Sequence, residues 1–383
     1  MNILFVASAK DKKSTGGHLH SLLHISRELS KVHYVKIISF GNETCELLDS
    51  SKMYLGYCNY KFYNIINIKK RIKLITKDFR PDIVNIYNDE IYLIFRFLIL
   101  FPFAKLIYTK CGGMNPIRNK WVYADNLILF SKENYNWFML NKNYKKSNIF
   151  LVPNRVGYVE LYDDNIINIK KEENKFCFLR IGRISHSYIN SYLKLIDLVS
   201  KLKKDNFDVH LYIIGVINES VYYDQIKQKL ELSGIDYTII TDPDKINIAS
   251  KYLYLGDCIL GSGRSAMEAM SVSKPVLVPA MNSPFPILLK KNNFEFFLNM
   301  NFSERSIVSN KLIIENYSNL CSLITDSEFR ENIKNESFYL FKEYLSLTSL
   351  NEKYNQIFAN STIKRTYSLY NFFYLIYLYI RYI

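Results

Sequence analysis

Short apolar runs of strand length alternate with helical segments along roughly the first 150 residues. The runs lie at 2–7, 34–40, 82–87, 104–110, 126–130 and 149–152. After the first run, leucines recur at the spacing of one helix face, at Leu19, Leu22, Leu23 and Leu29. Strands that are separated by helices predict a parallel, doubly wound sheet with helices on both faces.

The same alternation begins again near residue 175. Strand-like runs follow at 176–181, 209–214, 237–241, 258–260 and 276–278. One helix between them is marked by Leu195, Leu198, Val199 and Leu202, and a second, near 222–232, ends at Ser233 and Gly234. A glycine directly after a helix is a common C-cap, so the sequence predicts that this helix ends at the Ser233-Gly234 pair.

These patterns predict two domains, 1–160 and 161–345, with the polar stretch 163–174 as the linker. At 383 residues the chain is too long for one ordinary core, and each part is long enough to bury its own. The predicted fold class is α/β, with two doubly wound, Rossmann-like domains. Ligands of open α/β sheets bind outside the carboxyl ends of the strands, so we expect both sheets to face one cleft.

Residues 346–383 form a helical, aromatic-rich tail. Its last part, 366–383, interleaves Tyr with Leu, Ile and Phe, and Lys364, Arg365 and Arg381 flank it. Two interpretations stay open: a helix held at an anionic membrane surface, or a helix that packs back across the two domains. The apolar segment 91–103 is shorter than the roughly 20 residues of a span and contains Arg96 and Pro102, so it is predicted as a buried helix.

The net charge is +14, which favours phosphate-bearing or membrane partners. The lysines are spread along the chain without a nucleic-acid-binding signature, so nucleic acid is not expected as a partner. The basic stretch from Lys69 to Arg80 is either a solvated helix face or a docking face for anionic lipid. No secretory signal is evident, and the six cysteines are far apart, which predicts a cytoplasmic protein without a metal site.

The most informative segment follows the run 258–260 and reads Gly261-Ser262-Gly263-Arg264-Ser265. A Gly-rich turn that opens a helix presents backbone N–H groups to an anion, and Arg264 adds a charged fork for a phosphate. Glu268 lies about one helical turn further on, where a carboxylate can accept hydrogen bonds from ribose hydroxyls. The alternative is a tight strand-to-helix turn whose Glu makes a cap.

With Ala269, Met270, Pro275 and Val276, this segment resembles the donor-binding motif of family 4 glycosyltransferases, which have the GT-B fold. The resemblance implies that Glu268 acts at the donor site. It departs at Leu260, where the family has a glutamate that contacts the donor sugar or helps at the reacting centre. A divergent subfamily or weakened catalysis is therefore implied.

Weaker matches occur in the same order along the chain. Gly182 and Arg183 resemble the Gly-Arg pair in which Arg contacts the donor diphosphate, but Tyr188 replaces the family's Lys. Gly16 and Gly17 resemble a Gly-Gly pair that the family places against the diphosphate and the acceptor. Gly215 is a further, weaker match to the family. His18 follows this pair and can reach the cleft, whereas Cys111, in place of a family His region, is read as structural.

The resemblance implies a glycosyltransferase that moves a hexosyl group from a UDP- or GDP-linked sugar to a hydroxyl of a glycan or lipid-linked acceptor. It further implies a retaining, metal-independent enzyme of bacterial surface polysaccharide synthesis, with no cofactor, in the cytoplasm or peripherally on the inner face of the membrane. The catalytic residues would be Glu268 and Arg183. The alternative is a catalytically weak or inactive GT-B-shaped partner subunit that only binds sugar nucleotides.

Overall fold

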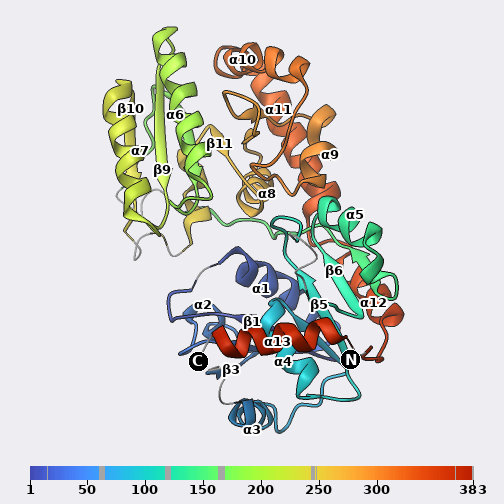
Figure 1. The fold of residues 1–383 in the computed structure, drawn as a ribbon. Coiled ribbons are helices and arrows are strands. Elements are labelled where there is room, and N and C mark those ends of the chain that lie inside the picture. Colours follow the sequence, from blue (N-terminus) through green and yellow to red (C-terminus); the bar gives the residue numbers. More distant parts are fainter. Residues whose placement is uncertain are drawn as a thin grey trace. The chain divides into compact units, whose positions relative to one another are not determined.

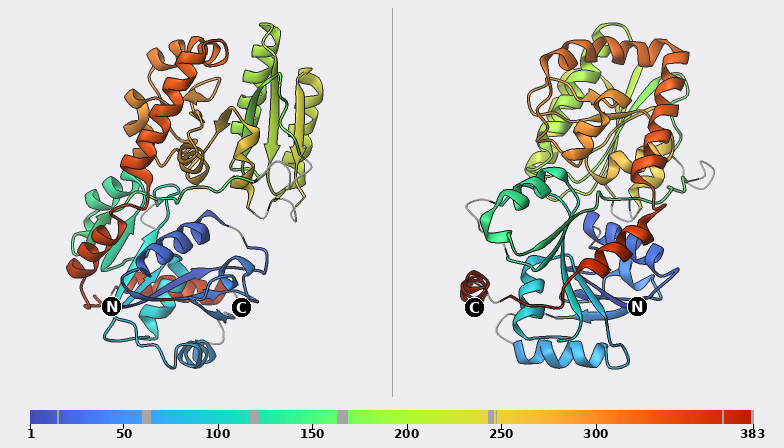
Figure 2. Two further views of the ribbon diagram at one scale, coloured as in Figure 1. Left: turned by 180° about the vertical axis from the view of Figure 1, so that it is seen from behind. Right: turned by 90° about the vertical axis from the view of Figure 1, so that its right-hand side faces the viewer.

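A computed structural model describes residues 1–14, 16–59, 65–116, 122–162, 169–242, 246, 248–366 and 368–381. The chain forms two compact units (Figures 1 and 2). The N-terminal unit comprises Met1–Asn154 and Leu347–Ile383, so it holds both chain ends, and the C-terminal unit comprises Arg155–Ser346. The sequence analysis placed the corresponding boundaries at 160 and 345. Of its predicted linker, 163–168 lies outside the described residues, and 169–174 belongs to the C-terminal unit, which begins at Arg155.

The N-terminal unit is built on a parallel sheet of seven strands in the order β3-β2-β1-β4-β5-β6-β7. The strands are β1 (Asn2–Ser8), β2 (Tyr34–Phe40), β3 (Tyr54–Cys58), β4 (Ile83–Ile86), β5 (Lys105–Lys110), β6 (Asn126–Leu129) and β7 (Asn148–Leu151). Six of them coincide with the predicted runs. β3 was not predicted, because its sequence, with Gly56 between tyrosines, carries no clear apolar run.

Helices cover both faces of this sheet because alternate strand residues point to opposite sides. One face packs against α1 (Gly17–Leu29), α2 (Glu46–Asp49) and α12 (Leu350–Asn360). The other packs against α3 (Ile65–Ile75), α4 (Asp89–Phe97) and α5 (Lys132–Leu140). A 3₁₀ turn, Lys142–Tyr144, follows α5, and α13 (Leu369–Arg381) lies against α4. The segment 91–103 was predicted as a buried helix, and its first part, 91–97, belongs to α4, whose Ile91, Leu93 and Ile94 are buried. The helix ends at Phe97, and Phe103 beyond it is 86% exposed, so the second part of that prediction was wrong.

The C-terminal unit contains a second sheet, in the order β10-β9-β8-β11-β12-β13. Its strands are β8 (Phe176–Ile181), β9 (Val209–Ile214), β10 (Asp236–Ile240), β11 (Cys258–Leu260), β12 (Val276–Val278) and β13 (Ile287–Leu288). The first five are parallel and match the predicted runs, whereas the short β13 is antiparallel to β12 and was not predicted.

Helices again lie on both faces of the sheet. One core contains α6 (Ile189–Lys204), α7 (Ser220–Ser233) and α10 (Asn310–Thr325), and the other contains α8 (Arg264–Ser271) and α9 (Lys291–Asn299). α11 (Ser327–Leu340) contributes to both cores, and Ala249–Leu255 and Phe341–Leu345 are short 3₁₀ and π segments. Gly234 ends α7 in the left-handed conformation, which confirms the predicted C-cap.

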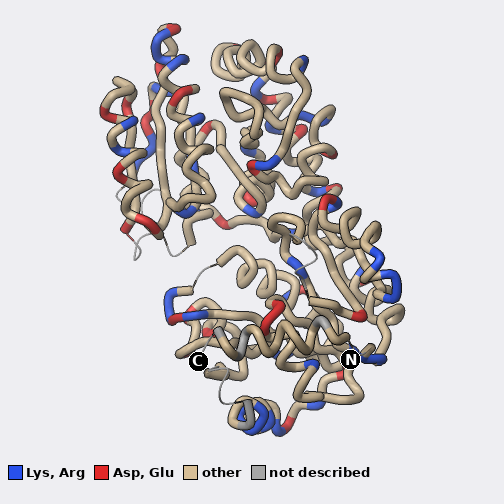
Figure 3. The backbone as a smooth tube through the Cα atoms, in the orientation of Figure 1, with Lys and Arg blue, Asp and Glu red and all other residues tan. Residues whose placement is uncertain are grey.

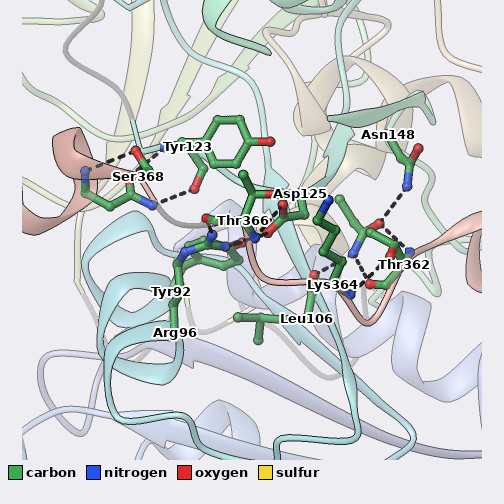
Figure 4. A network of polar contacts seen from close by, with 12 residues as sticks. Tyr92, Arg96, Leu106, Tyr123, Asp125, Asn148, Thr362, Lys364, Thr366 and Ser368 are labelled. Atoms are coloured by element: carbon green, nitrogen blue, oxygen red, sulfur yellow. Dashed lines mark hydrogen bonds and ion pairs between the residues drawn. The ribbon is translucent and has the colours of Figure 1, made fainter. Parts of the chain in front are cut away.

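The tail returns to the N-terminal unit and is fastened there by buried polar groups (Figure 4). Arg96 on α4 pairs with Asp125 across 2.6 Å, and their side chains are only 9% and 3% exposed. The backbone N–H of Thr366 donates to Asp125, and its carbonyl accepts from Arg96. Asn371 on α13 bonds the backbone of Tyr123 in both directions, at 2.9 Å each. The tail is therefore part of the N-terminal unit's fold.

Within the described residues, no helix combines the length and the apolar character that are needed to cross a bilayer. α13 is strongly apolar but runs only from Leu369 to Arg381.

We expect Asp125→Ala to lower the free energy of unfolding by about 3–5 kcal/mol, because it leaves the buried guanidinium of Arg96 without its counter-charge. Urea denaturation followed by circular dichroism measures this change. The exposed pair Lys201–Asp205 is the matched control, and Lys201→Ala should cost at most about 1 kcal/mol. Equal losses in both variants would show that the Arg96–Asp125 pair does not hold the tail.

Candidate functional site

The candidate site of the C-terminal unit lies where the strand order of its sheet reverses. β8 and β11 are neighbours, and the chain continues outward from them in opposite directions, to β9 and β10 on one side and β12 on the other. Loops that leave the carboxyl ends of two such strands separate and open a crevice, which is where open α/β sheets bind ligands. Gly182 and Arg183 follow β8, and the turn Gly261–Gly263 follows β11, so both predicted motifs flank this point.

The turn after β11 is tight for reasons internal to the protein. A Cβ on Gly261 would lie 2.4 Å from the Cα of Ala266 and 2.6 Å from its backbone nitrogen. Gly263 has a φ of +54°, which an L-residue rarely adopts, and its N–H donates to the carbonyl of Phe302. These glycines are thus needed to turn directly from β11 into α8, whether or not a ligand approaches them.

α8 begins at Arg264, and its first-turn N–H groups have no acceptor inside the helix. Ser265 lies in this turn, and its hydroxyl accepts a hydrogen bond from the N–H of Ser262 at 3.0 Å. A helix N-terminus carries a partial positive charge that favours anions. The turn is therefore held by a hydrogen bond of its own, and the start of α8 is the part of it whose partial charge favours an anion.

Arg264 and Glu268 form an ion pair one helical turn apart, with 2.8 Å between Nε and Oε1. Their side chains are 12% and 15% exposed. Burial raises the pKa of Glu268, and the charge of Arg264 opposes this effect. The sequence assigned Arg264 to a phosphate and Glu268 to a ribose, but here each side chain already neutralises the other.

Arg183 is exposed and lies beside Tyr188, which stands where the resemblance expects Lys. The guanidinium is 5.7 Å from the centre of the tyrosine ring and reaches its hydroxyl at 3.5 Å. Gly182 and Gly215 end neighbouring strands, and a Cβ on Gly215 would lie 1.7 Å from the carbonyl oxygen of Gly182. Gly215 is required because the two strand ends meet there, whereas Arg183 remains accessible.

Arg180 lies at the candidate site and was missed by the sequence analysis. It shares one face of β8 with Phe176 and Phe178, yet it is only 1% exposed. Its guanidinium donates to the carbonyl of Leu260 at 3.1 Å and to the hydroxyl of Ser262 at 3.3 Å. It thereby holds the end of β11 and the following turn. The available signal was a charged residue inside an otherwise apolar strand.

Glu304 supplies the carboxylate nearest to Arg180, with 3.8 Å between Oε1 and Nη2. It is 20% exposed, and burial raises its pKa, an effect that Arg180 opposes. Glu304 lies in the loop after α9, far along the chain from the turn that it approaches. Its local sequence therefore gives no sign that it belongs to this site. That loop is also held by the hydrogen bond from Gly263 to Phe302.

The N-terminal unit has a corresponding reversal between β1 and β4. Gly16 is the N-cap of α1 and Gly17 is its first residue, and a Cβ on Gly17 would meet no atom within 4 Å. His18 bonds the carbonyl of Ser8 at 3.0 Å, so its ring lies at the carboxyl end of β1. Burial raises the pKa of the Cys111 thiol, which argues against a thiolate nucleophile there.

In the described ranges, no group of three or more His, Cys, Asp or Glu side chains is arranged to hold a metal ion.

Comparison of the sequence with models of protein families and with curated proteins finds no match.

Solved structures resemble the chain over almost its whole length. HepE of Anabaena, in complex with UDP-glucose, matches with a TM-score of 0.65 and 13% identity, covering 94% of this chain and 99% of HepE. A glycosyltransferase from Rickettsia africae matches with a TM-score of 0.64 and 18% identity, covering 93% and 97%. The lipopolysaccharide outer core galactosyltransferase WaaB matches with a TM-score of 0.59 and 15% identity, covering 93% and 99%.

The chain has the GT-B fold. The predicted α/β fold class is thereby confirmed. The identities are all below one fifth, so the likeness concerns the fold, and the narrower resemblance to family 4 stays a prediction.

We predict that Gly261→Ala lowers the free energy of unfolding by about 1–3 kcal/mol, because its Cβ has to displace the backbone of Ala266. Gly17→Ala is the matched control and should leave stability unchanged, since its Cβ meets open space. Thermal unfolding of both variants tests this. A fully stable Gly261→Ala protein would mean that the turn is looser than described.

Proposed function

We propose that this chain is a glycosyltransferase that uses a nucleoside-diphosphate sugar, UDP- or GDP-linked, as donor. The observation that carries the proposal is the pair of glycine–arginine segments at the strand reversal of the C-terminal unit. A similar structure, HepE, contains UDP-glucose, which supports a nucleotide sugar as ligand. Transfer would place a hexosyl group on a hydroxyl of a glycan or lipid-linked acceptor, in surface polysaccharide synthesis.

The proposed chemistry needs the leaving diphosphate to be stabilised as its negative charge develops. The start of α8 and the exposed Arg183 would provide the positive charge that stabilises the diphosphate, in place of a metal ion. Glu268 would leave Arg264 for a donor hydroxyl, and Arg264 would turn to the phosphates. Retention of configuration follows from the resemblance. The protein would act in the cytoplasm, peripherally on the inner face of an anionic membrane.

A second function is favoured by one observation. Leu260 is fully buried where the resemblance has an acid, so a partner subunit that binds sugar nucleotides without turnover is the competing proposal. Purified protein that hydrolyses or transfers a donor sugar supports the enzyme. Binding without turnover across UDP- and GDP-sugars supports the partner subunit, and no binding of any of them contradicts both.

Arg183→Ala should weaken binding of UDP more than binding of uridine, because only UDP presents phosphates. A charge-assisted hydrogen bond contributes about 1.5–3 kcal/mol, so UDP affinity should fall at least roughly tenfold. Isothermal titration calorimetry with both ligands measures this, with Arg80→Ala, which removes an arginine from the N-terminal unit, as control. Equal losses for UDP and uridine would remove Arg183 from the phosphate site.

Glu268→Gln should weaken binding of the donor sugar nucleotide by roughly tenfold or more without unfolding the protein. Gln keeps the shape of Glu but not its negative charge. That charge pairs with Arg264 and, in the proposed site, accepts hydrogen bonds from the donor sugar nucleotide. The control is Glu315→Gln on the exposed surface of α10. Calorimetry together with the melting temperature separates the two effects, and unchanged affinity would place Glu268 outside the site.

A further inference from the structure

A cavity of about 470 Å³ opens in the N-terminal unit between the end of α4 and α13. Its wall is mainly apolar and includes Leu93, Phe97, Phe372 and Leu375. This volume falls in the usual range of small-molecule sites, about 300–1,000 Å³. The cavity is distinct from the strand reversal in this unit, because it lies at the carboxyl end of α4, which adjoins the amino ends of the parallel strands.

The cavity wall contains one cation whose hydrogen bonds are incomplete. Arg365 donates from Nη2 to the carbonyls of Leu100 and Phe101, at 2.9 and 2.7 Å. Its Nε and Nη1 atoms are buried and have no hydrogen-bond partner in the described structure. By contrast, Arg96 in the same wall is paired with Asp125 and Thr366 (Figure 4). Buried donors normally have acceptors, so the two unpaired donors of Arg365 are a feature that an acceptor from a ligand would satisfy.

The rim of the cavity exposes large apolar side chains. Ile99 and Phe372, which line the cavity, are 62% and 39% exposed. Ile99 also has a φ of +49°, which is unfavourable for a β-branched residue, so the loop after α4 is strained. Contiguous exposed apolar surface usually marks an interaction site. α3, on the same face of the sheet, carries Lys69, Lys70, Arg71 and Lys73, visible as a blue cluster in Figure 3.

We propose that the α4–α13 cavity binds one alkyl chain of an anionic membrane lipid, whose head group pairs with Arg365. The apolar wall suits the chain, the unsatisfied guanidinium suits the anionic head, and the exposed apolar rim suits entry from a bilayer. A nucleotide does not fit this wall, because its base and sugar would lose hydrogen bonds against Leu and Phe. The proposal does not depend on the proposed transferase activity.

The test uses the full-length protein and calorimetric titration with lysophosphatidylglycerol below its micelle concentration. Lysophosphatidylcholine and inorganic phosphate serve as separate ligands. We expect Leu375→Trp, which fills the cavity, to abolish binding of both lysolipids. Arg365→Gln should weaken lysophosphatidylglycerol roughly tenfold. It should weaken lysophosphatidylcholine less, because the choline cation already offsets the charge of that lipid's phosphate. Inorganic phosphate alone should not bind measurably, because it lacks the chain.

Two control variants change comparable side chains outside the cavity wall: Phe373→Ser on the exposed side of α13, and Arg80→Gln. Both should bind lysolipid like the unmodified protein. Leu375 is buried, so Leu375→Trp can lower the melting temperature. In that case Phe372→Glu is the second blocking variant, because Phe372 is 39% exposed and tolerates a change better. Unchanged binding in Phe372→Glu and Arg365→Gln would overturn the proposal. So would binding of phosphate alone, or a dimer that Phe372→Glu dissociates.

Discussion

The candidate donor site depends on one buried cation, the guanidinium of Arg180. It lies on the strand next to β11, in register with Leu260, and ties that strand's last carbonyl to the hydroxyl of Ser262. The rings of Tyr188 and Tyr192 lie within 6.0 and 5.2 Å of it, and Glu304 approaches from the loop after α9. A charge in this position is tolerated only because carbonyl, hydroxyl, carboxylate and aromatic faces surround it. Through Arg180, the neighbouring strand β8 thereby holds the turn that leads into α8.

Local pattern was sufficient for most of the fold because both sheets are parallel and buried. Strands such as β1 and β9 have no exposed face, so they read as continuous apolar runs, and the helices between them show one apolar side. β3 and β13 were missed for opposite reasons. β3 is half-buried along its length and lacks a clear run, whereas β13 has two residues and is defined only by its pairing with β12.

The candidate site was only partly predictable, since its geometry depends on contacts between distant segments. The positions of Gly261 and Arg264 followed from a strand, a turn and a helix start, all of which are local. The role of Arg180 depends on which strand lies beside β8, and that of Glu304 depends on a loop more than 120 residues further along the chain. The tail was undecided for the same reason: Asp125 and Asn126, which bond Thr366 and Thr362, give no sign in sequence that they bind it.

The position of Leu260 has a structural explanation that bears on activity. Its register partner is Arg180, so a carboxylate at 260 would lie beside a guanidinium on the adjacent strand. Here the residue at 260 is apolar and packs in the core with Cys258 and Leu277, while the acid near Arg180 comes from Glu304. The loss of an acid at 260 therefore does not leave this end of the sheet without a carboxylate. Because Glu304 is partly exposed and its pKa is raised by burial, it differs from a buried, permanently paired acid. An apolar residue at 260 is therefore compatible with a carboxylate at this end of the sheet, because Glu304 supplies one from another segment.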